Sequence, residues 1–398
     1  MAEKYMTNDG KNKTMEKLKT TLEAYGKTYG ANRMLPCKSC HFVTSCGLRF
    51  LDSMFSILHQ LVDSGLTCKV PLTANPRPLD TRNYPFMERI LGGFLYSRQR
   101  ELENLLLRLG LIDPDAFTCT PYYIGNKPSY GDIIAWAESS AVIYANSVLG
   151  ARTNRNSSII EIFSGILGET PEFGLLLDEN RKATWLVEVK TPSKPDPFIL
   201  GSLIGKTVGE DVPYIVGLEK WELKEYELKD LGSAMASWGA VGLFHAGELT
   251  AEAREEGPRL IRDDHKHLVV DDAKLKKMEQ EMTKGQTIEK PDLIVIGCPH
   301  LSREQIHSWV TKLEDRRFNV RTFMLAAPRI VSEIKNSKDY DRLKEAGVRL
   351  SSICPLMFTN IPTSRRLNIA TTSGKLAYYS HAVFFREDTL IENFTVKR

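Results

Sequence analysis

The spacing of apolar residues along the chain predicts a series of amphipathic helices. Apolar side chains recur every three or four positions over residues 15–25 and 48–62, which places them on one face of a helix. Gly26 and Gly65 follow these two stripes, and we expect them to end the helices. The same spacing predicts further helices over residues 87–109, 133–148 and 225–238.

Shorter apolar runs between these helices predict strands. Residues 183–189 alternate between apolar and polar side chains, as a half-buried strand does. Residues 293–296 form a continuous apolar run, which is typical of a strand buried on both faces. Short strands are also expected at residues 68–72, 117–119, 241–245 and 320–324.

The clearest pair of strand and helix lies near the C-terminus. The run 293–296 leads into Gly297-Cys298-Pro299-His300, and Ser302 then stands at an N-cap position, with Gln305 three residues later as in a capping box. A helix is predicted over 303–315. Alternating strands and helices predict an α/β protein with mostly parallel sheets, whose active site lies beyond the carboxyl ends of the strands.

The length of 398 residues suggests two or three domains. We expect approximate subdomains over residues 1–210, 211–288 and 289–398. Residues 252–290 are the most polar part of the chain, so we expect a solvated surface segment there, either an insertion or a junction between subdomains. We expect His265 and His267 in this segment to face solvent rather than bind a metal.

Composition excludes several classes of partner. The chain has 53 Lys and Arg against 50 Asp and Glu, and a net charge of +3 gives no electrostatic case for nucleic acid or an anionic membrane. No apolar stretch approaches the roughly 20 residues that span a bilayer, and the polar N-terminus shows no signal peptide. We expect a cytoplasmic location, where the seven cysteines are thiols or metal ligands rather than disulfides.

Three cysteines each end an apolar stretch and run into a proline turn. They are Cys119, Cys298 and Cys354. This context suits thiolates at the ends of buried strands that face one cleft. Three thiolates are one short of the four that hold a cubane iron–sulfur cluster, which leaves one iron open to substrate. The alternative is that all three are small buried apolar residues.

A second group of cysteines lies near the N-terminus. Cys37 and Cys40 have the spacing Cys-x-x-Cys-His with His41, and Cys46 is close by. Haem attachment requires export, for which there is no signal. A metal site, a redox pair and simple thiols in a substrate loop remain open for this group.

Several charged or polar residues suit an anionic ligand. Arg152 and Arg155 are three residues apart, and the planar arginine fork fits carboxylate or phosphate. Lys375 ends the turn sequence Thr371-Thr-Ser-Gly-Lys, which can hold an anion although it lacks P-loop spacing. Glu138 lies inside an otherwise apolar segment, where a carboxylate needs a partner.

Taken together, six stretches of the chain resemble the aconitase X family. They are residues 117–123 (FTCTPYY), 136–140 (WAESS), 145–155 (ANSVLGARTNR), 179–184 (ENRKAT), 296–300 (IGCPH) and 371–376 (TTSGKL). The likeness extends from about residue 29 to residue 379. It implies an aconitase-like α/β fold with several subdomains around a central cleft, and a hydro-lyase that acts as the large subunit beside a separate small, swivelling-domain subunit, as a heterodimer.

The resemblance also implies the site. The ligands of a [4Fe-4S] cluster, with one iron that the protein does not ligate, would be Cys119, Cys298 and Cys354. The pocket for a small anionic substrate would be formed by Lys38, Ser39, Thr44, Ser45, Cys46, Asn75, Pro76, Glu138, Ser139, Arg152, Arg155 and Lys375. Candidates for the proton-abstracting base are Glu138, Ser139 and Ser373, or a group of the small subunit.

Some positions depart from the family pattern. The loop after Lys38-Ser39 commonly carries a glycine and a tyrosine, and Ser352-Ile353 stands before Cys354 where an aspartate and a small polar residue are usual. The substrate is therefore open. The first hypothesis is dehydration of (R)-5-phosphomevalonate to trans-anhydromevalonate 5-phosphate in a mevalonate pathway. The alternatives are cis-3-hydroxy-L-proline dehydration and a non-catalytic partner subunit without a cluster.

Overall fold

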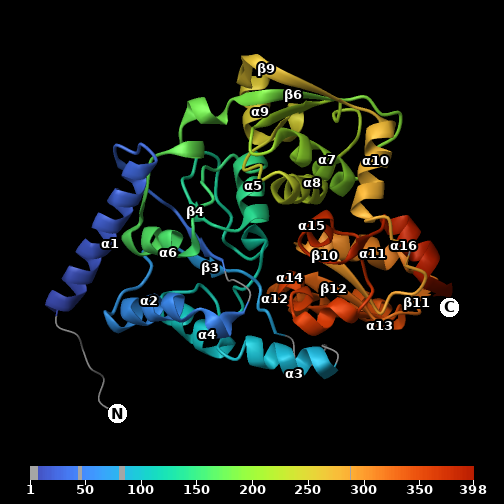
Figure 1. Ribbon diagram of the computed structural model, residues 1–398, viewed down its shortest axis with the longest axis horizontal. Helices are drawn as coiled ribbons and strands as arrows, with labels where there is room; N and C mark the ends of the chain where they lie inside the picture. The colour runs from blue at the N-terminus through green and yellow to red at the C-terminus, as the bar shows by residue number, and fades with distance from the viewer. Residues whose placement is uncertain (1–7, 44–46, 80–85, 287) are drawn as a thin grey trace.

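A computed structural model describes residues 8–43, 47–79, 86–286 and 288–398, and the chain forms three successive α/β parts (Figure 1). The blue-to-teal first part, the green-to-yellow second part and the orange-to-red third part occupy different regions of the molecule and meet near its centre. Every sheet with more than two strands is parallel among the described residues. The α/β prediction with mostly parallel sheets is confirmed.

The first part is built around a short parallel sheet of order β3-β2-β4, packed against helices. A separate antiparallel pair, β1 and β5, joins its two ends. Its elements are α1 (Asn8–Thr28), β1 (Met34–Pro36), β2 (Cys40–Phe42), α2 (Asp52–Asp63), β3 (Leu72–Ala74), α3 (Phe86–Leu95), α4 (Gln99–Arg108), β4 (Ala135–Trp136), α5 (Ser139–Ser147), α6 (Ser158–Leu167) and β5 (Glu169–Pro171).

The second part is a four-stranded parallel sheet of order β8-β7-β6-β9, with α7 and α8 packed closely together beside it. Its elements are β6 (Ala183–Val189), α7 (Pro197–Val208), β7 (Pro213–Val216), α8 (Glu225–Trp238), β8 (His245–Ala246), α9 (Ala251–Glu256), β9 (Ile261–Val270) and α10 (Asp272–Met282). Gly201 and Gly205 of α7 allow this contact, because an added Cβ would lie 2.3 Å and 2.6 Å from carbonyl oxygens of α8.

The third part is a five-stranded parallel sheet of order β13-β12-β10-β14-β15, with an antiparallel pair β11-β16 beside it. Its elements are β10 (Leu293–Leu301), α11 (Arg303–Lys312), β11 (Arg316–Phe318), β12 (Thr322–Ala326), α12 (Pro328–Lys335), α13 (Lys338–Glu345), β13 (Val348–Ser351), α14 (Pro355–Thr359), β14 (Ile369–Thr371), α15 (Gly374–Tyr379), β15 (Val383–Phe384), α16 (Glu387–Phe394) and β16 (Thr395–Lys397). The central strand β10 is buried along its whole length, as its apolar run predicts.

The carboxyl ends of two sheets lead to the same region of the molecule. In the first part β2, β3 and β4 are followed by Val43, Asn75 and Glu138. In the third part β13 and β14 are followed by Cys354 and Lys375. All five residues line one cavity, which lies at the carboxyl ends of parallel strands, where the sequence predicts the site.

Three helix boundaries differ from the sequence prediction. Helix α1 runs through Gly26 to Thr28, because this glycine is a packing position at which an added Cβ would lie 2.5 Å from the Pro171 Cβ. The stripe at 48–62 becomes a 3₁₀ turn followed by α2. The helix predicted over 87–109 divides into α3 and α4 at Tyr96, which is buried and donates its hydroxyl hydrogen to the Met357 carbonyl at 2.9 Å.

Short strands account for the other errors. The predicted helix 133–148 is the two-residue strand β4 followed by α5, so Glu138 is an N-cap rather than a residue inside a helix. Only Phe117 of residues 117–119 makes a bridge, to Ala74. The strand expected at 68–72 begins at Leu72, and the strand expected at 241–245 is reduced to β8. Two-residue strands are too short to show a periodic pattern.

The polar stretch 252–290 is regular structure rather than a peripheral insertion. It contains α9, β9 and α10, and β9 is an edge strand whose polar side chains are mostly exposed while it pairs with β6. His265 and His267 are on this strand and, as expected, neither is buried. The subdomain boundaries stay a prediction, and the β6–β7 pairing across position 210 favours placing the first boundary nearer residue 180.

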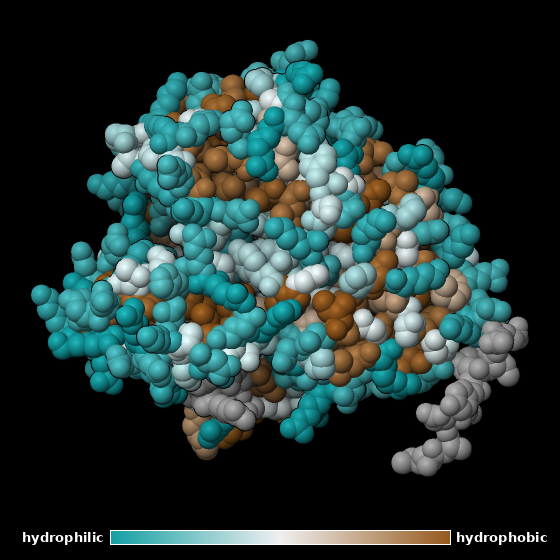
Figure 2. Space-filling view, turned by 180° about the vertical axis from the view of Figure 1, so that it is seen from behind, coloured by the Kyte–Doolittle hydropathy of each residue, from teal (hydrophilic) through white to brown (hydrophobic). Residues whose placement is uncertain are grey.

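Two features of the surface complete the fold. None of the helices in the described part of the chain combines the length and the apolar character that crossing a bilayer requires. Helix α3, at the lower edge of the molecule beside the grey atoms in Figure 2, presents an apolar face to solvent. The exposed side chains on it are Phe86, Met87, Ile90 and Phe94.

Candidate active site

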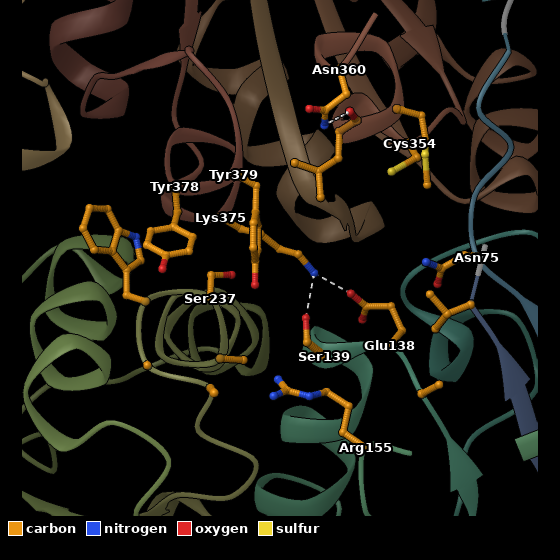
Figure 3. Close-up of a pocket in the computed structure, with 18 residues that line it drawn as sticks. Asn75, Glu138, Ser139, Arg155, Ser237, Cys354, Asn360, Lys375, Tyr378 and Tyr379 are labelled. Carbon is orange, nitrogen blue, oxygen red and sulfur yellow. Dashed lines mark hydrogen bonds and ion pairs between the residues drawn. The ribbon is translucent and has the colours of Figure 1, made fainter. Parts of the chain in front are cut away.

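A cavity of about 800 Å³ lies where the three parts of the chain meet (Figure 3). The first part contributes Asn75, Glu138, Ser139 and Arg155, and the second contributes the end of α8 with Ser237 and Trp238. The third contributes Cys354, Lys375, Tyr378 and Tyr379, together with Met357 of α14 and Asn360, the residue that follows this helix. The volume is ample for a small organic acid.

An ion pair between Glu138 and Lys375 forms the polar centre of the cavity wall. The Lys375 ammonium bonds the Glu138 carboxylate and donates to Ser139 Oγ at 3.1 Å and Ser140 Oγ at 2.7 Å (Figure 3). Glu138 is placed by its role as N-cap of α5, where its carboxylate also accepts from the Ala141 N–H at 2.6 Å. Residues that are far apart in sequence are therefore joined in a buried contact.

The charges of this pair support each other. Burial alone would raise the pKa of Glu138, but Lys375 and the Ala141 N–H hold that pKa below its ordinary value. Burial opposes the charge on Lys375, whereas Glu138 and the nearby Cys298 and Cys119 sulfurs raise its pKa. Both side chains are therefore charged near neutral pH.

The three cysteines of the proline turns come together beside this pair, and we refer to Cys119, Cys298 and Cys354 as the cavity thiols. Cys298 lies in β10, and Cys354 is the N-cap residue of α14 and lines the cavity. Burial raises the pKa of the Cys298 thiol, Lys375 lowers it, and the other two cavity thiols raise it again. The three sulfurs are therefore close enough to influence one another electrostatically.

The cavity thiols fit an iron–sulfur centre by the chemistry of their surroundings. Cys119 Sγ accepts a hydrogen bond from the His300 N–H at 3.3 Å, which favours a thiolate. Lys375 lowers the pKa of both Cys119 and Cys298 against the larger effect of burial. Within the described ranges no three Cys, His, Asp or Glu side chains surround one point as ligands of a single ion do. This does not exclude a cluster, because each thiolate of a cluster ligates a different iron and the sulfurs need not surround a single point.

A second set of thiols lies behind the sheet of the first part, against α6. These α6 thiols are Cys37, Cys40 and Cys68. Cys37 Sγ donates to the Ser164 carbonyl at 3.6 Å and Cys40 Sγ to the Glu161 carbonyl at 3.1 Å. Neither sulfur lines the cavity, and the His41 ring bonds Thr73 and Asn75 instead of joining them.

The two arginines of the 145–155 stretch have different environments. Arg152 is held by Asp178, Glu252 and the Leu176 carbonyl, and it does not line the cavity. Arg155 is exposed and lines the cavity. In the part of the chain that the structure describes, no hydrogen bond or ion pair occupies its guanidinium. The structure thus brings only Arg155 to the cavity.

Four other predicted residues lie apart from the cavity. Ser39 Oγ accepts from the Trp136 indole at 2.7 Å, and Pro76 is buried. Lys38 is exposed on the surface. Ser373 donates its hydroxyl hydrogen to the Cys298 carbonyl and accepts from the Leu376 N–H at 3.0 Å, so its side chain is held by the backbone beside Cys298 and at the start of α15. Thr44, Ser45 and Cys46 lie outside the described residues.

Several residues of the cavity were missed by the sequence analysis. Ser140, which follows the predicted Ser139, does not line the cavity itself, but its hydroxyl accepts a hydrogen bond from Lys375, and a buried lysine needs such acceptors. Trp238, Tyr378 and Tyr379 line the opposite wall, with Trp238 and Tyr378 packed at 4.9 Å between ring centroids. Nothing in their sequence context distinguishes these aromatic residues from core positions.

Comparison with known proteins identifies the family. The sequence profiles of the aconitase X first, second and third domains match residues 1–179, 183–280 and 291–391. This chain belongs to the aconitase X family of hydro-lyases. The structure is also similar to one titled "Crystal structure of Thermococcus kodakaraensis aconitase X (holo-form)", with a TM-score of 0.83 at 31% identity over 98% of this chain and 100% of that one.

Individual aconitase X relatives carry two different names. The phosphomevalonate dehydratase large subunit of Thermococcus kodakarensis is 36% identical over 93% of this chain and 92% of its own length. The large subunit of the same name from Methanocaldococcus jannaschii is 32% identical over 90% of this chain and 89% of its own. The cis-3-hydroxy-L-proline dehydratase of Pseudomonas aeruginosa is 29% identical over 90% of this chain and 62% of its own length.

Proposed function

We propose that this chain is the large subunit of a phosphomevalonate dehydratase. It would remove water from (R)-5-phosphomevalonate to give trans-anhydromevalonate 5-phosphate, in the cytoplasm and together with a separate small subunit. The observation that carries the proposal is the cavity lined by Cys354, the buried Lys375 and the exposed Arg155, with Cys119 and Cys298 close enough to Lys375 for its charge to lower their pKa. The names and full-length match of the large-subunit relatives support the substrate and the partner.

The cavity thiols are the residues that would hold the cofactor, a [4Fe-4S] cluster ligated by Cys119, Cys298 and Cys354. When bound, such a cluster supplies an iron that no side chain ligates and that acts as a Lewis acid toward the leaving hydroxyl. Lys375 places a positive charge near the Cys119 and Cys298 sulfurs and so favours their thiolate form. The reaction breaks one C–O bond and one C–H bond and forms a C=C bond and water.

Two cationic residues suit the two anionic groups of the substrate. Lys375 is buried in the wall and already paired with Glu138, so it orients an acidic group near the thiols rather than capturing it from solvent. Arg155 is exposed, lines the same cavity and can offer its whole planar fork to the phosphate. Arg152 is a structural residue because its guanidinium is held in ion pairs.

Ser139 is the candidate base that the geometry favours. Its hydroxyl lines the cavity, and the Lys375 ammonium at 3.1 Å would stabilise negative charge on its oxygen after it loses a proton. Glu138 is a weaker base, since Lys375 and a backbone N–H keep its pKa below the ordinary value. Ser373 is less favoured, because it does not line the cavity and its hydroxyl donates to the Cys298 carbonyl and accepts from the Leu376 N–H.

A second candidate substrate is cis-3-hydroxy-L-proline, which the Pseudomonas aeruginosa relative favours. This substrate has one carboxylate and no phosphate, so one of the two cations, Lys375 or Arg155, would have no anionic group to bind. The two candidates therefore differ in what they require of one side chain, and an arginine variant can separate them.

The experiment is an anaerobic turnover assay of the chain co-purified with the small subunit, on both substrates. Arg155→Gln should raise KM for (R)-5-phosphomevalonate about tenfold to hundredfold, as expected for the loss of charge-assisted hydrogen bonds, with kcat changed much less. Arg329→Gln, an exposed arginine of α12 away from the cavity, is the matched control. Turnover of hydroxyproline alone would overturn the proposed substrate, and an equal effect of both arginine variants would overturn the role of Arg155.

A further inference from the structure

His300 lies where the three parts of the chain meet, and it does not line the cavity. It belongs to β10, follows Cys298 by two residues and is fully buried. Four of its atoms contact other segments, and three of these contacts are made with the segments that carry the cavity thiols.

The imidazole ring joins two of these segments. Nε2 lies 3.1 Å from the Ile353 carbonyl, which can only accept, so Nε2 carries a hydrogen and donates it. Ile353 immediately precedes Cys354. Nδ1 lies 3.0 Å from Oγ1 of Thr118, the residue before Cys119, and this hydroxyl also accepts from the Thr120 N–H at 3.1 Å. The ring thus bridges the side chain of Thr118 and the backbone of Ile353, which are the residues that precede two cavity thiols.

The backbone of His300 makes the other two contacts. Its N–H donates to Cys119 Sγ at 3.3 Å, and its carbonyl accepts from the Lys229 ammonium at 2.9 Å. Lys229 is fully buried on α8 of the second part, and it also donates to Gln305 Oε1 at 2.7 Å. Gln305 in turn closes the capping box that begins α11. The backbone of His300, two residues after Cys298, is therefore held by the first part of the chain through Cys119 and by the second part through Lys229.

We propose that His300 is the positioning residue that sets the relative placement of the three cavity thiols, with Lys229 as its anchor in the second part. This inference rests on the proposed function, in which these thiols hold the iron centre. Ligands from three separate segments must meet in one arrangement for a centre to assemble and persist, and outer contacts commonly fix such ligands. His300 contacts Thr118, Cys119 and Ile353 and does not line the cavity, so it acts through the segments that carry the sulfurs and not on substrate.

The test compares side-chain variants that remove one or both ring contacts. His300→Ala removes both, whereas His300→Gln carries an amide that can reach the Nε2 position and keep the donor to Ile353. His245→Ala is the matched control, since His245 is equally buried and bonds one carbonyl, that of Arg181 at 2.7 Å, away from the cavity. Iron and sulfide content after anaerobic reconstitution, and the rate of iron loss to a chelator, are measured for each.

A second measurement uses the metal-free chain and does not depend on iron. Phenylarsine oxide condenses with two thiols that can reach one arsenic atom: two As–S bonds form, and the arsenic-bound oxygen leaves as water with the two thiol protons. Peptide mapping identifies which cysteines are bridged. We expect His300→Ala to slow bridging among the cavity thiols and to speed iron loss by at least tenfold, with His300→Gln between it and the wild type and His245→Ala near the wild type.

The outcomes are distinguishable from a failure of the proposed function. If the wild type takes up no iron but His300→Ala still slows bridging of the cavity thiols, the result supports the positioning role of His300 and contradicts the proposed iron centre. If His300→Ala retains iron and bridges thiols like the wild type, the positioning role is overturned. An equal loss in His245→Ala and His300→Ala would also overturn it, because the effect would then follow from general destabilisation.

Discussion

The cavity thiols and the α6 thiols are similarly buried, but different chemical groups surround them. The cavity thiols face an ammonium group, Lys375, and a backbone donor, the His300 N–H, both of which favour thiolate. The α6 thiols face carbonyl acceptors and the buried Glu161 carboxyl, which raises the pKa of Cys37 in addition to the dominant effect of burial. The two groups therefore differ in one neighbour: the Lys375 ammonium lowers the pKa of Cys119 and Cys298 against the effects of burial and Glu138, whereas no cationic side chain of the described residues does so for Cys37 or Cys40.

The space around the two groups differs as well. Cys354 opens onto the cavity of about 800 Å³. Behind the first sheet, an added Cβ on Gly165 of α6 would lie 3.0 Å from Cys40 Sγ and 3.2 Å from Cys68 Sγ, so helix and sulfurs are in close contact. The α6 thiols therefore pack a core, and the metal and redox interpretations of Cys37 and Cys40 receive no support from their surroundings.

The largest expected effect is a loss of iron when one cysteine of the cavity thiols is replaced by serine, compared with the same replacement in the α6 thiols. Cys298→Ser should reduce the iron content after anaerobic reconstitution from about four per chain to near zero, because a cluster with two thiolate ligands is not retained. Cys40→Ser should leave the iron content unchanged. Iron and sulfide analysis of the two variants checks this, and loss of iron in Cys40→Ser alone would reverse the assignment of the two groups.

Removing the ammonium beside the cavity thiols should have the next largest effect. Lys375→Met leaves Glu138 as a buried carboxylate without its partner, which costs about 3–5 kcal/mol in the free energy of unfolding. Lys375→Met/Glu138→Gln should recover most of that stability and none of the turnover. If the double variant regains activity, Lys375 has only a structural role.

The pH dependence of this pair follows from its pKa shifts. The pKa of Glu138 is lowered, so its contribution to stability is present above the ordinary value of 4.5 and is lost as pH falls through the lower folded value. The pKa of Lys375 is raised, so its contribution is complete below the ordinary value of 10.5 and is lost as pH rises beyond it. Denaturant melts of the wild type and the double variant should differ most between these limits.

Glu161 offers a smaller test on the α6 side. Burial raises the pKa of this carboxyl to about 8, and its Oε2 has no partner in the described structure. Between pH 4.5 and 8 the folded state holds a proton that the unfolded state releases, so stability falls as pH rises. Glu161→Gln should remove this loss and exceed the wild type by on the order of a few kcal/mol at pH 8. Parallel stability curves from pH 5 to 8 would contradict this account.

The smallest effect is expected from a methyl group at the α6 contact. Gly165→Ala should destabilise the chain by about 1–2 kcal/mol, because its Cβ would lie 2.9 Å from Cys40 Cβ and force a shift. Gly93→Ala, in α3 with nothing within 4 Å, is the matched control and should gain up to about 1 kcal/mol in helix propensity. Equal melting temperatures for the two variants would show that the α6 thiols have free space around them.

Sequence patterns that span a few residues predict individual strands, helices and caps, but they do not predict which distant residues meet in the site. The strand at β10, the Ser302 cap and Gln305 were all predictable, because apolar runs and capping boxes act over a few residues. The partnership of Glu138 and Lys375 spans 237 positions, and only their residue types indicated a role. Arg152 and Arg155 look alike in sequence, and tertiary ion pairs alone make the first structural.

The central claim is that the cavity thiols, and not the α6 thiols, hold an iron centre that borders the substrate cavity. Mössbauer spectroscopy of the chain reconstituted with iron-57, with and without (R)-5-phosphomevalonate, tests this most directly. The account predicts about four irons per chain, of which one changes its spectrum when substrate is added, with the same result in Cys40→Ser. The account would be contradicted if the chain binds no iron, or if the Mössbauer spectrum of the bound iron does not change when substrate is added.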